Sequence, residues 1–365
     1  MRKLFKYRFL FLIILVTSSG VKTRAQNRVI DSLKLALKNA KHDTVRFQLR
    51  KVIGEVAAIL RIGYWDSLYQ DSKNVGYKIM EAEALHNIGF LYDMQGDMLK
   101  SMEYAKRSLK VRNEINDKVG IAGSLNNIGY TYFSQGDIQL ALEHYHKSLK
   151  IQEEIGDKRG MANTLNNIGF TYFSQNDKQH ALECYQRSLS LRREIGLKSG
   201  IAQSLNNIGG IYHEQKNFLT ALKYYEEGLK LEEEINDKSG VSNSLNNIGH
   251  IYYKQGFLSK ALLIHEKSLA INREINDKRG ISHSLNNIAT IMIEEGKLKE
   301  ALIYAESCMQ TSKELGFPKN IKNAAYTLKI IFQKQNKYKE AFEMYELEIK
   351  MRDSIFYVFR KSQFL

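Results

Sequence analysis

A 40-residue period organises this chain and restricts what it can fold into. The string Leu-Asn-Asn-Ile-Gly begins at Leu125, Leu165, Leu205 and Leu245, and close variants of it begin at Leu85 and Leu285. A fixed period of this length is typical of a solenoid, a propeller or an array of repeats. The chain contains one proline in 365 residues, which favours long helices over a sheet protein with many tight turns.

Each period predicts two amphipathic helices. Apolar and small residues recur at three- and four-residue steps across 121–135 and again across 138–155, and this spacing produces one apolar stripe on each helix. Gly136 suits a left-handed residue at the end of the first helix, and Asp137 can cap the second. Equivalent glycines and asparagines occur at Gly96, Asn176, Gly256, Gly296 and Asn336. We therefore expect an all-α solenoid of stacked antiparallel helical hairpins.

Small residues recur where the two helices of a hairpin must approach each other. Gly129 and Ala141, with their counterparts in the other periods, are expected at this close approach. Tyr132 and Tyr145 are expected to fill the wider gaps between successive hairpins. One hairpin cannot bury its apolar face alone, so the array is stabilised by contacts between neighbours.

These residues resemble a known signature. The types and spacing of tetratricopeptide repeats are matched by Leu125, Ile128, Gly129, Tyr132, Ala141 and Tyr145, with Ser148 at the later small position. Glu153 stands where the family usually has a proline, and the period resembles the 40-residue subclass seen in kinesin light chains and in exported sensor regions of bacterial histidine kinases. The resemblance covers residues 81–355 as seven repeats, which start near residues 81, 121, 161, 201, 241, 281 and 321. It implies a superhelix whose first helices line a concave surface.

The two ends of the chain depart from this period. Residues 1–25 resemble a secretory signal peptide, with basic residues before the apolar run Phe9–Val16 and small residues up to Ala25. Because that run is far shorter than the ~20 residues needed to span a bilayer, we expect cleavage, export to the periplasm or medium of a bacterium, and no stable membrane span afterwards. Residues 26–80 are expected to form a degenerate helical cap, and 356–365 a short apolar and basic tail.

A repeated asparagine is the candidate contact line for a ligand. It occurs once per repeat on the first helix, at Asn126, Asn166, Asn206, Asn246 and Asn286, and an amide can bind a peptide backbone without reading side chains. Side-chain contacts on the same face are expected from Tyr130, Phe133, Phe170, Phe173, His213, His250 and Tyr253. Packing between repeats is the alternative role for both sets, and for the second asparagines, such as Asn127, we expect hydrogen bonds to neighbouring loops.

Charge and chemistry point away from other classes of function. The formal charge is +14, but residues 1–25 carry six basic and no acidic side chains, which leaves about +8 and no indication of nucleic-acid binding. His144 and His146 lie two residues apart and point to different sides of a helix. Cys184 and Cys308 lie about three repeats apart, so we expect no disulfide. The acidic runs near Glu154 and Glu232–Glu234 are interpreted as solvated faces neutralised by lysines.

The sequence therefore predicts a protein without enzymatic activity, metal or cofactor, which binds a protein or an extended peptide. The alternative hypothesis is a truncated or split sensor portion of a bacterial signalling protein whose output domain is encoded separately. Neither hypothesis identifies the ligand or the oligomeric state.

Overall fold

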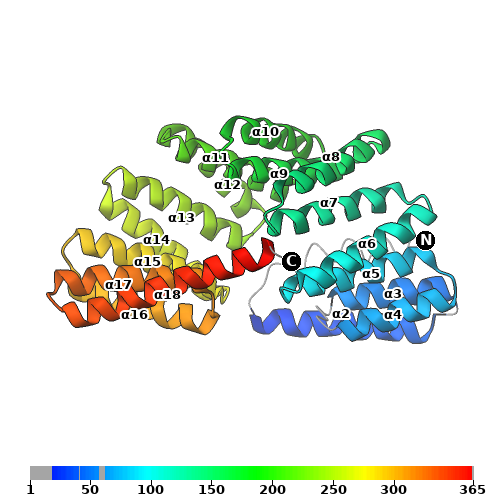
Figure 1. Ribbon diagram of the computed structural model, residues 1–365, viewed down its shortest axis with the longest axis horizontal. Helices are drawn as coiled ribbons and strands as arrows, with labels where there is room; N and C mark the ends of the chain where they lie inside the picture. The colour runs from blue at the N-terminus through cyan, green and yellow to red at the C-terminus, as the bar shows by residue number, and fades with distance from the viewer. Residues whose placement is uncertain (1–18, 41, 57–61, 364–365) are drawn as a thin grey trace. The chain divides into compact units, whose positions relative to one another are not determined.

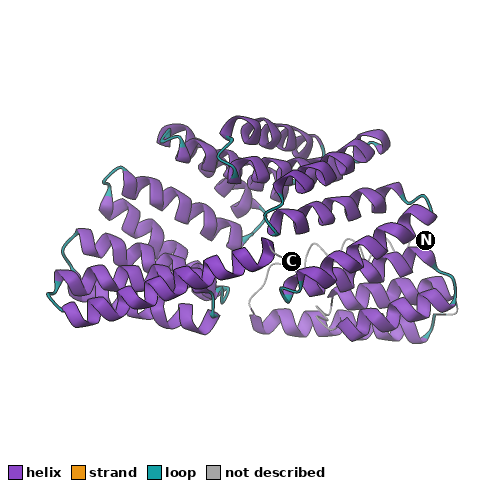
Figure 2. Cartoon of the chain, viewed as in Figure 1, coloured by secondary structure: helices purple, strands orange, loops and turns teal. Residues whose placement is uncertain are grey.

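The computed structural model describes residues 19–40, 42–56 and 62–363. Within these residues every regular element is a helix (Figure 2), and the prediction of an all-helical solenoid built from stacked hairpins is confirmed. The chain forms two compact units, and the boundary between them falls between Leu191 and Arg192. The run Phe9–Val16 lies outside the described residues, and Ala25 lies within the first described helix.

Unit 1 contains the helices drawn from blue to green in Figure 1. Their bounds are α2 (Ser19–Lys38), α3 (Asp43–Val56), α4 (Ile62–Asn74), α5 (Lys78–Met94), α6 (Met98–Glu114), α7 (Lys118–Ser134), α8 (Ile138–Ile155), α9 (Lys158–Ser174) and α10 (Lys178–Glu194), whose last residues from Arg192 lie beyond the boundary. Consecutive helices pack against each other from α2 to α9, and α7 also contacts α9. Helices α3 and α4 form a hairpin that departs from the repeat sequence. In it the ring of Trp65 packs on Gly54, and a Cβ added to Gly54 would lie 2.7 Å from Cζ2 of Trp65.

Unit 2 continues the pattern to the last described helix. Its helices are α11 (Lys198–Glu214), α12 (Phe218–Glu234), α13 (Lys238–Lys254), α14 (Leu258–Glu274), α15 (Lys278–Glu294), α16 (Leu298–Leu315), α17 (Pro318–Lys334) and α18 (Tyr338–Gln363). Odd-numbered helices are the first helices of the hairpins, and α13 contacts α15 as α15 contacts α17. No described helix combines the length and the apolar character needed to cross a membrane.

The turns form as the sequence predicts. Gly136 has a φ of +83°, and Asn176 has a φ of +63°. The carboxylate of Asp137 accepts a hydrogen bond from the amide of Leu140 at 3.2 Å and so caps α8. Lys216 takes the same left-handed conformation with a φ of +60°, although its residue type gives no signal for it.

The core confirms the close approach of the two helices in a hairpin. A Cβ on Gly129 would lie 2.8 Å from Cδ1 of Tyr145 and 3.1 Å from the carbonyl oxygen of Ala141. Tyr145, 1% exposed, therefore packs on the glycine of its own hairpin as well as against Leu165 and Ile168 of the next one. The expectation that Tyr145 only fills the gap between hairpins was incomplete.

Candidate functional site

The first helices leave one stripe of side chains uncovered. On α7, Leu125, Ile128 and Gly129 are buried, whereas Tyr130 is 47% exposed and Asn126 and Phe133 are half-buried. Residues three and four apart share one side of a helix, so the same positions form one face in each repeat. On α5, α7 and α9 we call this the unit 1 face; it comprises Glu83, His86, Phe90, Asp93, Met94, Gly123, Asn126, Tyr130, Phe133, Ser134, Asn163, Asn166, Phe170, Phe173 and Ser174.

All five predicted asparagines lie on this stripe and are half-buried. Asn167 donates a hydrogen bond to Oδ1 of Asn126 at 3.2 Å, from the first helix of the following repeat. In unit 2, the hydroxyl of Thr327 donates to Oδ1 of Asn286 at 2.8 Å in the same way. The side-chain amides of Asn126 and Asn286 thus accept a hydrogen bond from the neighbouring repeat, and these two bonds leave their Nδ2 donors for other partners.

Two asparagines of unit 2 are held more tightly. Asn206 donates to Oε1 of Glu232 at 2.8 Å and to the hydroxyl of Ser244 at 3.0 Å. Asn246 accepts a hydrogen bond from Nδ1 of His265 at 3.0 Å. Removing either amide would leave buried polar groups without a partner, which costs stability.

The second asparagine of each repeat links first helices to each other. Asn127 donates to Nδ1 of His86 at 3.2 Å, so its partner is a residue of α5 and not of a loop. Burial, with Arg112 and Lys51 nearby, lowers the pKa of His86 to about 4. His86 is therefore neutral at pH 7, which suits its role as an acceptor.

The exposed aromatic side chains form a row across unit 1. Phe133 and Phe170 lie with ring centroids 5.3 Å apart, and Phe170 is 49% exposed. Phe173, on the same face of α9, is half-buried. Phe90, 56% exposed, and Met94, 57% exposed, also lie on this face and were not predicted. Phe90 stands 40 residues before Tyr130, so the period alone could have identified it.

The corresponding row in unit 2 is more polar. His213 and His250 lie with ring centroids 5.2 Å apart, and His250 and Tyr253 with centroids 6.1 Å apart. The Tyr253 hydroxyl donates a hydrogen bond to Glu294 on α15. Burial is the main cause that lowers the pKa of both histidines, so at pH 7 they act as neutral hydrogen-bonding groups.

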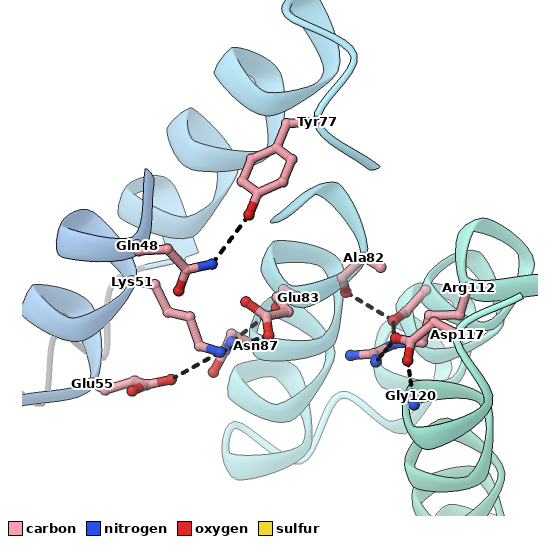
Figure 3. Close-up of polar contacts among 11 residues, drawn as sticks. Gln48, Lys51, Glu55, Tyr77, Ala82, Glu83, Asn87, Arg112, Asp117 and Gly120 are labelled. Carbon is pink, nitrogen blue, oxygen red and sulfur yellow. Dashed lines mark hydrogen bonds and ion pairs between the residues drawn. The ribbon is translucent and has the colours of Figure 1, made fainter. Parts of the chain in front are cut away.

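A polar network joins the N-terminal helices to the start of the unit 1 face (Figure 3). Nζ of Lys51 on α3 lies 2.6 Å from Oε1 of Glu83 on α5 and 3.9 Å from Glu55. Gln48 donates to the hydroxyl of Tyr77 at 3.2 Å. Burial is the first cause that raises the pKa of Glu55. These side-chain contacts connect α3 to the start of α5, next to Glu83 of the unit 1 face.

The interpretation of Glu232 as a solvated residue was wrong. Glu232 is 4% exposed, and burial raises the pKa of its carboxyl despite the hydrogen bonds from Ser244 and Asn206. The prediction of neutralised acids is confirmed for its neighbour Glu234, which pairs with Lys198 at 2.9 Å, and for Glu154, which pairs with Lys118 at 3.2 Å. Position 232 belongs to a series of buried polar residues that recurs at Gln152, Arg192, Asn272 and Ser312.

The reactive groups of the described chain are scattered. No three His, Cys, Asp or Glu side chains in the described ranges come together as metal ligands. His144 lies 2.9 Å from the carbonyl oxygen of Leu140, and His146 is exposed. Both cysteines are free thiols, and burial raises the pKa of Cys184 to about 11. What the arrangement offers is a surface of rings, amides and a few charges.

Comparison with known protein families identifies the repeat. Models of the tetratricopeptide repeat match residues 82–115, 120–194 and 200–274. No curated protein sequence matches the chain.

Solved structures with the same fold are distant in sequence. The apo quorum sensor NprR from B. thuringiensis is 16% identical with a TM-score of 0.65, covering 96% of this chain and 99% of that one. A Rap protein complexed with Competence and Sporulation Factor is 14% identical with a TM-score of 0.64, covering 93% and 98%. BtubC from P. vanneervenii is 19% identical with a TM-score of 0.54, covering 60% and 92%.

Proposed function

This chain belongs to the tetratricopeptide repeat family, and from that premise we propose that it is a non-enzymatic scaffold which binds a protein or an extended peptide along its first helices. The observation that carries the proposal is the exposed aromatic row of the unit 1 face. Phe90, Tyr130 and Phe170 occupy one position in three successive repeats and are 56%, 47% and 49% exposed. Exposed apolar side chains that gather on one surface are typical of interaction sites.

The amides beside this row supply the polar half of a binding surface. Asn126 accepts a hydrogen bond from Asn167 through Oδ1, and its Nδ2 can donate to a peptide carbonyl. One such bond contributes about 0.5–1.5 kcal/mol net, so useful affinity needs several repeats together with the aromatic contacts. In unit 2, we propose that His213, His250 and Tyr253 contact a ligand in the same way.

The names of two of the similar structures support the proposal of a binding scaffold. One is a Rap protein complexed with Competence and Sporulation Factor, and another is the quorum sensor NprR. Their likeness to this chain lies in the fold. We therefore extend to this chain the use of the repeat as a binding surface, and not the identity of any ligand.

The experiment is a titration of a partner that co-purifies with the chain and is identified by mass spectrometry. We expect a Tyr130→Ala/Phe170→Ala variant to bind it at least about tenfold more weakly, since truncating an aromatic contact in an interface costs about 1 kcal/mol or more. Leu99→Ala is the matched control, because Leu99 is 55% exposed on a second helix. Full affinity of the double variant, or equal loss in the control, would rule out the unit 1 face.

The asparagines are poorer sites for this test than the sequence suggested. Alanine at Asn206 or Asn246 would break contacts between repeats, so a loss of binding could follow from a loosened fold. Substitutions of the exposed aromatic residues are therefore the better test, because they can weaken binding without breaking these contacts between repeats.

We propose two further points on the sequence and the names alone. Export follows from the basic and apolar residues at the start of the chain, and fractionation of cells that express a tagged chain tests it: a tag found in the cytoplasm with residues 1–25 intact would contradict export. A sensor role is the alternative function, favoured by the name of NprR. A kinase or DNA-binding domain encoded next to this chain would support that role, and unrelated neighbouring sequence would count against it.

A further inference from the structure

The charged members of the unit 1 face are acidic, with Arg159 one turn before Asn163 on α9 and Lys51 paired with Glu83 as the basic side chains at its edge. Among the residues that form it, Glu83 and Asp93 are the ones with acidic side chains, because the remaining members are apolar, amide or hydroxyl side chains and His86, whose pKa burial lowers to about 4. The chain as a whole has a formal charge of +14. An acidic surface on a basic protein favours a basic partner through charge complementarity.

Asp93 lies within the aromatic row. By the 40-residue period it occupies the place of Phe133, whose ring lies 5.3 Å from Phe170. The same register puts the carboxylate of Asp93 beside Tyr130 and three residues after Phe90 on α5. A carboxylate on the same face as two aromatic side chains that are 47% and 56% exposed favours a ligand that combines a cation with apolar groups.

The carboxylate of Asp93 has unused capacity. Its Oδ1 is buried and accepts no hydrogen bond from the described part of the chain. Burial raises the pKa of this carboxyl, with no neighbouring cation to oppose the rise. Glu83 likewise has a buried oxygen, Oε2, without a hydrogen-bond partner, but its Oε1 is engaged by Lys51 at 2.6 Å. Asp93 is therefore the acid on this face whose carboxylate no cation of the described residues pairs with.

We propose that the unit 1 face binds a peptide segment in which an arginine, flanked by apolar side chains, pairs with Asp93 while its neighbours contact the aromatic row. A guanidinium fits better than an ammonium, because it is planar and can stack on an aromatic ring while it donates a hydrogen bond to the carboxylate. The flanking apolar side chains cover Phe90, Tyr130 and Phe170. This inference rests on the proposed function and specifies the class of segment that the face selects.

Three labelled hexapeptides test the inference by fluorescence anisotropy with the full chain. The first is Gly-Leu-Arg-Phe-Leu-Gly, and the other two carry glutamine or glutamate in place of arginine. We expect the arginine peptide to bind at least about tenfold more tightly than the glutamine peptide, as a charge-assisted hydrogen bond in a partly buried place allows. The glutamate peptide should bind most weakly.

The Asp93→Asn variant should reduce the arginine preference to less than about twofold while the affinity for the glutamine peptide is kept. Glu154→Gln is the matched control, since it removes one negative charge from an exposed ion pair on α8, and it should keep the preference. The inference is overturned if the three peptides bind alike, if none binds, or if the preference survives in Asp93→Asn. The proposed function would then still be decided separately, by the partner titration with the Tyr130→Ala/Phe170→Ala variant.

Discussion

Substituting alanine for the glycine of the close approach should destabilise one repeat and spare another. In Gly129→Ala the new Cβ lies 2.8 Å from the ring of Tyr145 and 3.1 Å from the backbone oxygen of Ala141. Carbon atoms pack best at about 3.5–4.0 Å, and Tyr145 is 1% exposed and enclosed. Overpacking of this kind costs about 1–3 kcal/mol, and the better helix propensity of alanine returns about 1 kcal/mol. The expected net loss is about 0–2 kcal/mol.

Gly89→Ala makes the matched comparison in the same unit. There the place of Tyr145 is taken by Ala105, and the nearest atoms to the new Cβ are the carbonyl oxygen of Ser101 at 3.3 Å and Cβ of Tyr104 at 3.4 Å. A small shift relieves such contacts, so the propensity term of about 1 kcal/mol dominates. We expect this variant to lie between no change and a gain of about 1 kcal/mol. Repeat six already pairs Ala289 with Ala305 at these positions, and both are fully buried.

The assay is urea denaturation followed by circular dichroism, with the slopes compared so that a shifted midpoint reports stability. Gly129→Ala should unfold at lower urea than Gly89→Ala, by the equivalent of about 1.5 kcal/mol from the midpoints of the two ranges. If the two variants have equal midpoints, or if Gly89→Ala is the less stable one, the argument from the tyrosine ring is wrong.

Three other changes test separate parts of the structure. Burial raises the pKa of Glu232 in the folded chain above its unfolded value, so the wild-type chain loses stability as the pH rises through the folded pKa. Glu232→Gln should therefore be more stable than the wild type at pH 7, by an amount that shrinks toward pH 4; a less stable variant at pH 7 in urea denaturation would contradict this. Asp137→Ala removes the cap of α8 and should cost about 1 kcal/mol, whereas an unchanged midpoint would mean that the cap is dispensable. Cys184, with a pKa of about 11, should react slowly with a disulfide reagent at pH 8 while the chain is folded and rapidly in urea; fast labelling of the folded chain would show that the thiol is accessible as thiolate.

The 40-residue period and the residue types were sufficient to predict the helical hairpins. Gly136, Asn176 and Gly129 have local causes, since a left-handed turn or a close backbone approach admits few residue types. Lys216 shows the limit of this reasoning, because its left-handed conformation is imposed by the flanking helices and not by its own side chain.

The buried polar series was not predictable from the local pattern. Glu232 stands in an acidic run that looks solvated, and only the packing of α12 against α13 brings it to Ser244. The asparagine line was placed on the correct helices, but its bonds to the next repeat depend on contacts between residues 38–41 positions apart. Asp93 was missed for a similar reason, since a single acid on a helix has meaning only beside the aromatic side chains of the neighbouring repeat.

Hydroxyl-radical footprinting tests the central claim most directly, because it reads the exposure of the side chains themselves. Oxidation of Phe90, Met94, Tyr130 and Phe170 would be compared in the free chain and with the co-purified partner, with Leu99 and Tyr338, which is 68% exposed, as references. We expect the partner to slow oxidation of the residues of the unit 1 face and to leave both references unchanged. Protection confined to Leu99 and the other second-helix side chains, with Phe90, Tyr130 and Phe170 oxidised as before, would contradict it.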